Sequence, residues 1–333
     1  MNRKWLSLFL VLGLAFSFGL VTVTGCSQTQ NNPSSDPASP PSGTTTIEVA
    51  SGGQITVASG SDTGTASFVV VDQNGAPINS TNYLNAANIT IQVWSTTTIT
   101  SQAATVGTLT YTGGSTGDPI SYALTLDRSG SMYYSDLVSM ESAALAFIAN
   151  TGTADEGMVI NFSTNVAVDQ GLTTNKSLLS YAVTNESVAA DMTALYRSIN
   201  VGTATLDASA ANTRKAVIAM TDGGNNQTPT DINDPIGKAQ AAGIPVYTVG
   251  LGSGISATNL QQIATDTGGL FYSAPTAADL VDLYNKISTA LNSTWSITFT
   301  SPVTFTTSTT YYILVTITYP GVAPASTLYT VTL

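Results

Sequence analysis

Between Pro119 and about Leu291, short apolar runs alternate with segments in which apolar residues recur at helical spacing. This alternation predicts an α/β domain built from βαβ units around a doubly wound, mostly parallel sheet. The expected strands are Ile120–Leu126, Gly157–Phe162, Ala216–Met220, Ile244–Val249 and Gly269–Ser273. The expected helices are Ser135–Asn150, Lys176–Val183, Thr193–Val201, Pro235–Ala242, Ala257–Thr265 and Thr276–Leu291. Such sheets bind ligands at the carboxyl ends of their strands, so a functional site is expected there.

The α/β segment, residues 119–291, is flanked by two β segments, residues 44–118 and 292–333. Both alternate apolar residues with polar ones, which predicts half-buried strands. We expect the two segments to pair into one β-sandwich that holds the α/β domain as an insertion, because so few C-terminal strands are marginal alone. Two independent β pieces, or a tail packed on the α/β domain, are the alternatives. Trp94 and Trp295 occupy apolar strand positions and are expected in the core.

The first 25 residues have the features of a secretory signal peptide. Arg3 and Lys4 precede an almost unbroken apolar stretch, Trp5 to Val23. The following Val23-Thr24-Gly25-Cys26 resembles the lipobox of bacterial lipoproteins, and Cys26 is the one cysteine of the chain. The resemblance implies a mature protein that begins at a lipidated Cys26 and is anchored to a membrane by that lipid. An uncleaved signal anchor or plain secretion is the alternative.

Residues 26–43 are polar and rich in proline and serine, and we expect them to form a disordered tether. The expected location is therefore outside the cytoplasm, at the cell envelope. Ser27 stands where an aspartate would retain some Gram-negative lipoproteins in the inner membrane, so the outer membrane is favoured.

The composition excludes several kinds of chemistry. There is no histidine and a single cysteine, which removes Ser-His-Asp and Cys-His nucleophiles and His/Cys zinc sites. The chain carries 20 acidic and 9 basic residues, for a net charge of -11. This balance argues against a nucleic-acid partner, since phosphate backbones are bound by clusters of lysine and arginine.

Oxygen-bearing side chains gather at three strand–helix junctions. Asp127, Ser129 and Ser131 follow the first expected strand at positions i, i+2 and i+4. Thr193 lies at the start of an expected helix, and Asp222 comes just after the strand that ends at Met220. All five side chains offer oxygen, and none offers nitrogen or sulfur. That donor set favours a hard divalent cation, Mg²⁺ first and Mn²⁺ or Ca²⁺ as alternatives.

The set Asp127-x-Ser129-x-Ser131 with Thr193 and Asp222 resembles the metal-ion-dependent adhesion site of the von Willebrand factor type A domain family. The resemblance covers residues 119–291. It implies that Ser129 and Ser131 bind the metal directly and that Thr193 does so in a conformation-dependent way. Asp127 and Asp222 would act partly through water. A coordination position would stay open for an acidic group of a partner protein.

Some neighbouring residues leave alternatives open. Asp191-Met192 stands where the family often has Gly-Gly. Asp191 is either a solvated residue favoured near a helix N-terminus, or an extra negative charge near the metal that strengthens cation binding and disfavours an acidic partner. Tyr133 and Tyr134 either form an aromatic rim beside the metal or pack over the loop. Arg128 is expected to be a surface charge.

The expected function is binding rather than catalysis, because the motif has no Gly-rich phosphate loop and no lysine beside it. The leading hypothesis is a cell-envelope lipoprotein that binds a carboxylate of a partner protein through the metal, in adhesion or envelope protein interaction. The alternative is a structural or assembly lipoprotein in which the metal only stabilises the loops. An accessory subunit of an ATPase is a third possibility, against which the export signal argues.

Overall fold

The computed structural model describes residues 36–113, 119–185, 191–252, 255–274, 286–287, 290–291 and 293–333, of which 51–54 and 112–113 are described by their backbone only. Residues Ser34–Leu333 form one compact unit. The predicted fold class is confirmed: a mostly parallel sheet with helices on its two faces accompanies two antiparallel sheets.

The α/β part is built on a six-stranded sheet in the order β11-β10-β9-β6-β7-β8. Its strands are β6 (Ile120–Asp127), β7 (Glu156–Phe162), β8 (Val166–Thr173), β9 (Arg214–Thr221), β10 (Val246–Leu251) and β11 (Phe271–Ala274). All neighbouring pairs are parallel except β7 and β8. Every residue of the central strand β6 is buried, as expected for a parallel strand covered on both faces.

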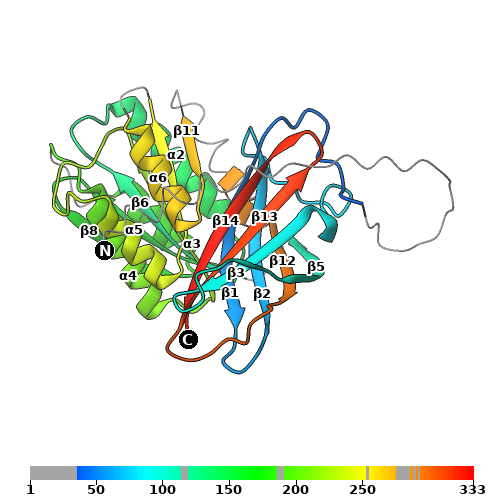
Figure 1. Ribbon diagram of the computed structural model, residues 1–333. Coiled ribbons are helices and arrows are strands. Elements are labelled where there is room, and N and C mark those ends of the chain that lie inside the picture. Colours follow the sequence, from blue (N-terminus) through cyan, green and yellow to red (C-terminus); the bar gives the residue numbers. More distant parts are fainter. Residues whose placement is uncertain are drawn as a thin grey trace. The chain divides into compact units, whose positions relative to one another are not determined.

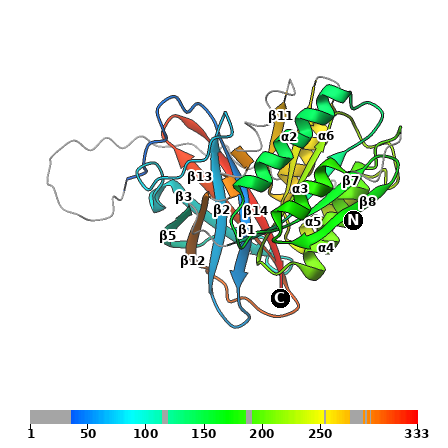
Figure 2. The same cartoon turned by 180° about the vertical axis from the view of Figure 1, so that it is seen from behind.

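Helices cover both faces of this sheet. Figure 1 shows the face covered by α4 (Leu195–Ser209), α5 (Asn233–Ala242) and α6 (Ala257–Thr267), and Figure 2 shows α2 (Tyr134–Asn150) and α3 (Lys176–Thr184) from behind. Because successive side chains of a strand point to opposite faces, neighbouring residues of β6 belong to different cores. Tyr122 joins the core under α2 and α3, and Ala123 joins the core under α4 to α6.

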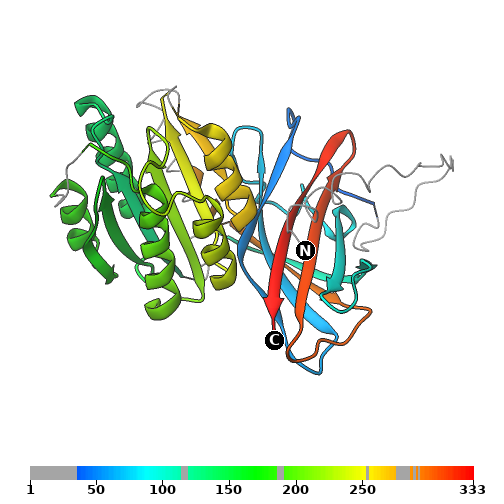
Figure 3. The same ribbon diagram turned by 60° about the vertical axis from the view of Figure 1, so that its left-hand side comes forward.

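The two β segments combine strands in both antiparallel sheets. One sheet has the order β1-β2-β12-β5 and the other β14-β13-β3-β4. Their strands are β1 (Ile47–Val57), β2 (Thr63–Asp72), β3 (Ile89–Ser95), β4 (Gln102–Ala103), β5 (Thr105–Gly113), β12 (Ser293–Thr300), β13 (Thr310–Tyr319) and β14 (Val322–Thr332). Thus β12 from the C-terminal segment lies between β2 and β5, and β13 pairs with β3. Figure 3 shows the blue N-terminal and red C-terminal strands together.

One apolar core holds the two antiparallel sheets together. Trp295 of β12 is fully buried in it, and its indole Nε1–H donates to the carbonyl of Ile78 at 2.7 Å. Trp94, by contrast, lies on the outer side of β3 and is only half-buried, where its ring stacks on Tyr312 at 5.6 Å. The prediction that Trp94 is a core residue is therefore wrong. In β3 the alternation places Ile89, Ile91 and Val93 inside and Trp94 outside.

Several element boundaries differ from expectation. Strand β8 has no strict apolar alternation and is not predicted from the sequence. It is a half-exposed strand at the edge of the sheet, and among the described strands it pairs with β7 alone. Helix α4 begins at Leu195, two residues later than expected, and continues to Ser209. Most of the expected helix Thr276–Leu291 falls outside the described residues, although Ile287, Ala290 and Leu291 are buried.

Candidate metal site

Asp127 is the last residue of β6, and its carboxylate is held from two sides. It is fully buried. One oxygen, Oδ1, accepts the backbone N–H of Ser129 at 2.8 Å. The other, Oδ2, accepts the hydroxyl of Thr221 at 2.5 Å, and Thr221 ends the neighbouring parallel strand β9. The carboxylate is therefore fixed at the carboxyl ends of two adjacent strands, where α/β sheets place their ligands.

Ser129, Ser131 and Asp222 form a continuous row of oxygen atoms beside Asp127. The two serine hydroxyls lie 3.1 Å apart. Ser131 donates its hydroxyl to Oδ1 of Asp222 at 2.7 Å, although the two residues are 91 positions apart in the sequence. Four of the five predicted site residues are thus linked by hydrogen bonds in one cluster.

Thr193 is tied to the loop that carries Asp222. Its backbone N–H donates to the side-chain oxygen of Asn226 at 2.6 Å, and its carbonyl accepts the backbone N–H of the same residue at 3.0 Å. Thr193 is only 4% exposed. Among the described residues, no hydrogen bond reaches its hydroxyl and none links that hydroxyl to the other four predicted site residues. The position of Thr193 at this edge is supported, but its role as a ligand stays a prediction.

Asn225 and Asn226, in the loop after Asp222, form hydrogen bonds with the segment that leads into α4. Asn226 forms the two hydrogen bonds with Thr193 described above. The side-chain oxygen of Asn225 accepts the backbone N–H of Tyr196, in the first turn of α4, at 3.1 Å. The amide of Asn225 also donates to the carbonyls of Gln227 and Pro229. These bonds connect the loop after β9 to the start of α4.

Burial and neighbouring charge favour a cation at this cluster. Burial raises the pKa of Asp127 to about 6, against the opposing effect of its hydrogen bonds. Burial also raises the pKa of Asp222, and the nearby charge of Asp136 raises it further. Both shifts mean that the ionised forms lack compensating positive charge. Since the five donors are all hard oxygens, the residues present fit a divalent cation such as Mg²⁺.

The cluster depends on hydroxyl groups as much as on carboxylates. Over the described part of the chain, no group of three or more His, Cys, Asp or Glu side chains is arranged to hold a metal. Ser129 and Ser131 would therefore have to complete the coordination of any cation bound between Asp127 and Asp222.

Asp191 lies directly beside the serine loop. A Cβ atom on Gly130 would be 3.2 Å from Oδ1 of Asp191 and 3.3 Å from its Cα, so the glycine lets the two loops approach closely. Asp191 is exposed and precedes the first residue of α4 by four positions. Of the two interpretations open at the sequence level, the geometry favours an additional negative charge near the site.

The aromatic residues after the motif do not pack over the loop. Tyr133 and Tyr134, at the start of α2, are 76% and 83% exposed. Met192, next to Asp191, is 40% exposed. The geometry favours the interpretation of the two tyrosines as a rim next to the oxygen cluster.

The prediction for Arg128 is wrong. Arg128 is 5% exposed, and its guanidinium forms an ion pair with Glu141 at 2.6 Å. Successive side chains of the motif point in opposite directions. Those of Asp127 and Ser129 face the oxygen cluster, while that of Arg128 points into the protein. Arg128, Glu141 and Thr221 are the residues of this region that sequence reasoning missed. Of these, only Thr221 had a visible signal, a hydroxyl at the end of a strand next to Asp222.

Comparison with known protein families agrees with this geometry. Residues 123–286 match the family model described as the von Willebrand factor type A domain. These residues form a von Willebrand factor type A domain. No curated protein matches the chain.

Several solved structures resemble the chain at low identity. A von Willebrand factor type A protein from Catenulispora acidiphila is 12% identical, with 89% of this chain and 75% of that one covered and a TM-score of 0.47. The vWF domain of the type V pili tip protein Mfa5 from Porphyromonas gingivalis is 13% identical, covering 53% and 95%, with a TM-score of 0.45. Proximal thread matrix protein 1 from the mussel byssus, with a zinc-occupied MIDAS motif, is 16% identical, covering 57% and 49%, with a TM-score of 0.48.

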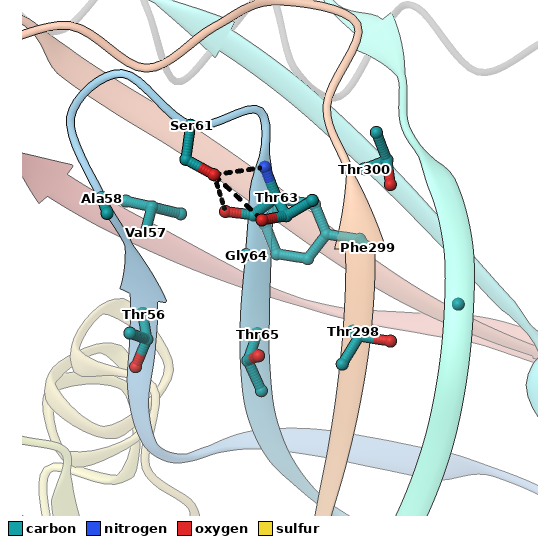
Figure 4. Close-up of a pocket in the computed structure, with 11 residues that line it drawn as sticks. Thr56, Val57, Ala58, Ser61, Thr63, Gly64, Thr65, Thr298, Phe299 and Thr300 are labelled. Atoms are coloured by element: carbon teal, nitrogen blue, oxygen red, sulfur yellow. Dashed lines mark hydrogen bonds between the residues drawn. The ribbon is translucent and has the colours of Figure 1, made fainter.

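A separate cavity of about 490 Å³ lies on the β-sandwich and contains none of the predicted site residues. Figure 4 shows it on the sheet formed by β1, β2, β12 and β5, with threonines on three neighbouring strands. No charged side chain lines it. It offers hydroxyl groups and a few apolar side chains.

The predicted signal peptide, the lipidation site Cys26 and residues 26–35 of the predicted tether lie outside the described residues. Residues 36–43 are described, and Ala38 exchanges two hydrogen bonds with the side chain of Asn88, so the prediction of disorder is wrong for this end of the tether. In the part of the chain that is described, no helix is both long and apolar enough to cross a membrane.

The raised pKa of Asp127 predicts how cation binding depends on pH. Below about pH 6, affinity for Mg²⁺ is expected to fall by about tenfold per pH unit, because a proton competes with the cation for the carboxylate. Calorimetric titration with Mg²⁺ from neutral pH down to about pH 5 measures this. A constant affinity over that range would contradict the assignment of Asp127.

The raised pKa of Asp127 makes the metal-free protein more stable at low pH, whereas it makes cation binding weaker there. An unfolded aspartate has a pKa of about 3.9, so the folded protein holds this proton more tightly than the unfolded chain does. Protonated Asp127 therefore stabilises the folded, metal-free protein. This contribution to the free energy of unfolding is fully present below about pH 3.9 and is lost as the pH rises through about 6.

Proposed function

We propose that this chain is a cell-envelope lipoprotein whose von Willebrand factor type A domain binds a divalent cation and, through it, a carboxylate of a partner protein. The observation that carries the proposal is the hydrogen-bonded row from Ser129 through Ser131 to Asp222, next to the buried carboxylate of Asp127. A bound Mg²⁺ would supply positive charge and a free coordination position for one more oxygen atom.

The chain's own residues have separate tasks in this proposal. Ser129 and Ser131 offer neutral oxygens, while Asp127 and Asp222 offer charge. Thr221 and the backbone of Ser129 keep the Asp127 carboxylate in one orientation through their hydrogen bonds. The two hydrogen bonds between Thr193 and Asn226 keep the loop after β9 close to the start of α4. The exposed rings of Tyr133 and Tyr134 would contact the partner around the metal.

We propose that the site binds a partner and does not catalyse a reaction. The chain has no histidine, and its single cysteine belongs to the lipobox-like sequence, so neither residue type offers a general base or nucleophile at the site. The N-terminal signal-like sequence and the polar tether support export and a lipid anchor on Cys26. We assign adhesion or envelope protein interaction as the role on these grounds.

The test is capture of envelope proteins by the immobilised chain in buffer with Mg²⁺ and in buffer with EDTA. Specific binding is expected only with Mg²⁺, and it should be lost in the variant with Ser129→Ala and Ser131→Ala. Binding to the native partner that survives both treatments would refute the adhesion role. If the variant loses thermal stabilisation by Mg²⁺ but retains the partner, the structural lipoprotein becomes the better assignment.

The position of Asp191 predicts a charge effect on both ligands. Replacing it with asparagine should weaken Mg²⁺ binding by roughly eightfold and strengthen binding of an acidic peptide by roughly threefold. Unit charges several ångströms apart in water interact by about 0.6 kcal/mol, and a divalent cation interacts with the same carboxylate about twice as strongly. Calorimetry with Mg²⁺, then with an aspartate peptide, measures both changes. Asp207→Asn, near the other end of α4, is the matched control and should change neither affinity. Equal effects of the two substitutions would exclude a local role for Asp191.

A further inference from the structure

Arg128 sits between two residues of the proposed metal site but faces away from it. It follows Asp127 and precedes Ser129, and its side chain is 2% exposed. Its backbone N–H donates to the carbonyl of Phe162, the last residue of β7, at 2.6 Å. The loop is therefore attached to the neighbouring strand at the point where the arginine side chain leaves it.

The guanidinium donates to three different elements. Its Nε donates to the side-chain oxygen of Asn161 on β7 at 2.9 Å. Its Nη1 donates to Glu141 on α2 at 2.6 Å, and its Nη2 donates to the carbonyl of Val183 on α3 at 2.5 Å. The planar fork of arginine suits such divergent contacts, which a lysine ammonium does not reproduce.

The contact on β7 is itself fixed by further hydrogen bonds. The side-chain amide of Asn161 donates to Asp169 on β8 at 2.7 Å and to the carbonyl of Ala182 on α3 at 3.1 Å. Asn161 is fully buried. A buried network whose donors and acceptors are paired in this way defines one arrangement of the groups it joins.

We propose that Arg128 is a positioning residue that holds the Asp127–Ser131 loop in the geometry required for cation binding. This inference rests on the proposed metal site. Asp127 and Ser129 are its direct neighbours in the chain, so a shift of the arginine moves both of their backbone positions. Outer residues that orient metal ligands typically change metal affinity by about 10- to 100-fold when replaced. Arg128 acts through the loop and does not itself touch the cation.

Electrostatics alone predicts the opposite effect of Arg128→Met on Mg²⁺ affinity. Removing a positive charge near a cation site would strengthen cation binding, if charge were all that mattered. A positioning role predicts weaker binding instead. Arg128→Met therefore separates the two effects. Arg128→Lys keeps the charge and loses the three-way contact, so electrostatics alone predicts no change and positioning again predicts a loss.

The experiment is calorimetric titration of Mg²⁺ into the full chain, well below the unfolding temperature of each metal-free variant. Arg128→Met should weaken Mg²⁺ binding by roughly 10- to 100-fold and Arg128→Lys by about tenfold. The exposed Arg197 on α4 supplies the matched control, since Arg197→Met should leave the affinity unchanged. The unfolding temperature without metal is recorded for all variants, because a purely structural role would lower it and leave the affinity of the folded protein intact.

The outcomes separate this inference from the metal site on which it rests. If the unsubstituted chain does not bind Mg²⁺, the metal site is refuted and Arg128 has nothing to position. If it binds and the Arg128→Met variant binds as tightly or more tightly, the positioning role alone is refuted. Should Arg128→Met not fold, Arg128→Lys decides, and an unchanged affinity in that variant overturns the inference.

Discussion

Replacing Ser129 and Ser131 together by alanine is expected to weaken Mg²⁺ binding by at least about 100-fold, since changes to outer residues alone cost about 10- to 100-fold. The two hydroxyls supply the neutral oxygens of the site, and Ser131 also holds Asp222 by a 2.7 Å hydrogen bond. The hydrogen bond from the backbone N–H of Ser129 to Asp127 remains available in this variant. Calorimetry measures the affinity directly.

A matched pair of serines controls for general effects of the substitution. Ser139 and Ser142 on α2 donate their hydroxyls to helix carbonyls four residues earlier, at 2.9 and 2.8 Å. Ser139→Ala with Ser142→Ala should leave Mg²⁺ binding unchanged. Equal Mg²⁺ affinity in the Ser129/Ser131 variant and the unsubstituted chain would show that the metal is bound elsewhere.

Trp295→Ala is expected to lower the free energy of unfolding by about 3–5 kcal/mol, the usual cost of removing a large buried aromatic side chain. Trp295 is fully buried in the sandwich core, and its ring lies 4.9 Å from that of Tyr111. The substitution also leaves the carbonyl of Ile78 without its indole donor. Urea unfolding followed by circular dichroism gives the change.

Trp94 offers the comparison within the same sandwich. Its stacking on Tyr312 takes place on the outer side of β3, so Trp94→Ala should cost only about 1 kcal/mol. Similar losses for the two tryptophans would contradict the assignment of Trp295 to the core and Trp94 to the surface. The comparison of the two tryptophans also tests how the two β segments combine, because β12, which carries Trp295, lies between β2 and β5 of the N-terminal segment.

The residues that can be read from the sequence are those whose signal is local. Periodic apolar spacing located β6, β7, β9 and most helices to within a few residues. Asp127, Ser129 and Ser131 are predicted as site residues because their spacing and their place after a strand are visible in one short segment. Thr193 and Asp222 needed the additional expectation that parallel strands end at the same edge of a sheet.

The residues that escaped prediction depend on contacts between distant segments. Arg128 looks like a surface charge, because Glu141, Asn161 and Val183, its three partners, lie on three other elements. The sequence leaves two interpretations of Asp191 open, and the close approach of Asp191 to Gly130 in the fold distinguishes them. Strand β8 has little apolar alternation, since an edge strand can remain half-exposed.

The most direct test of the central proposal is an anomalous difference map from crystals of the chain soaked in Mn²⁺. We predict a single strong peak at the carboxyl ends of β6 and β9, with the hydroxyl oxygens of Ser129 and Ser131 at direct coordination distance, about 2 Å. Mn²⁺ bound elsewhere, or no peak between Asp127 and Asp222, would contradict the proposed metal site.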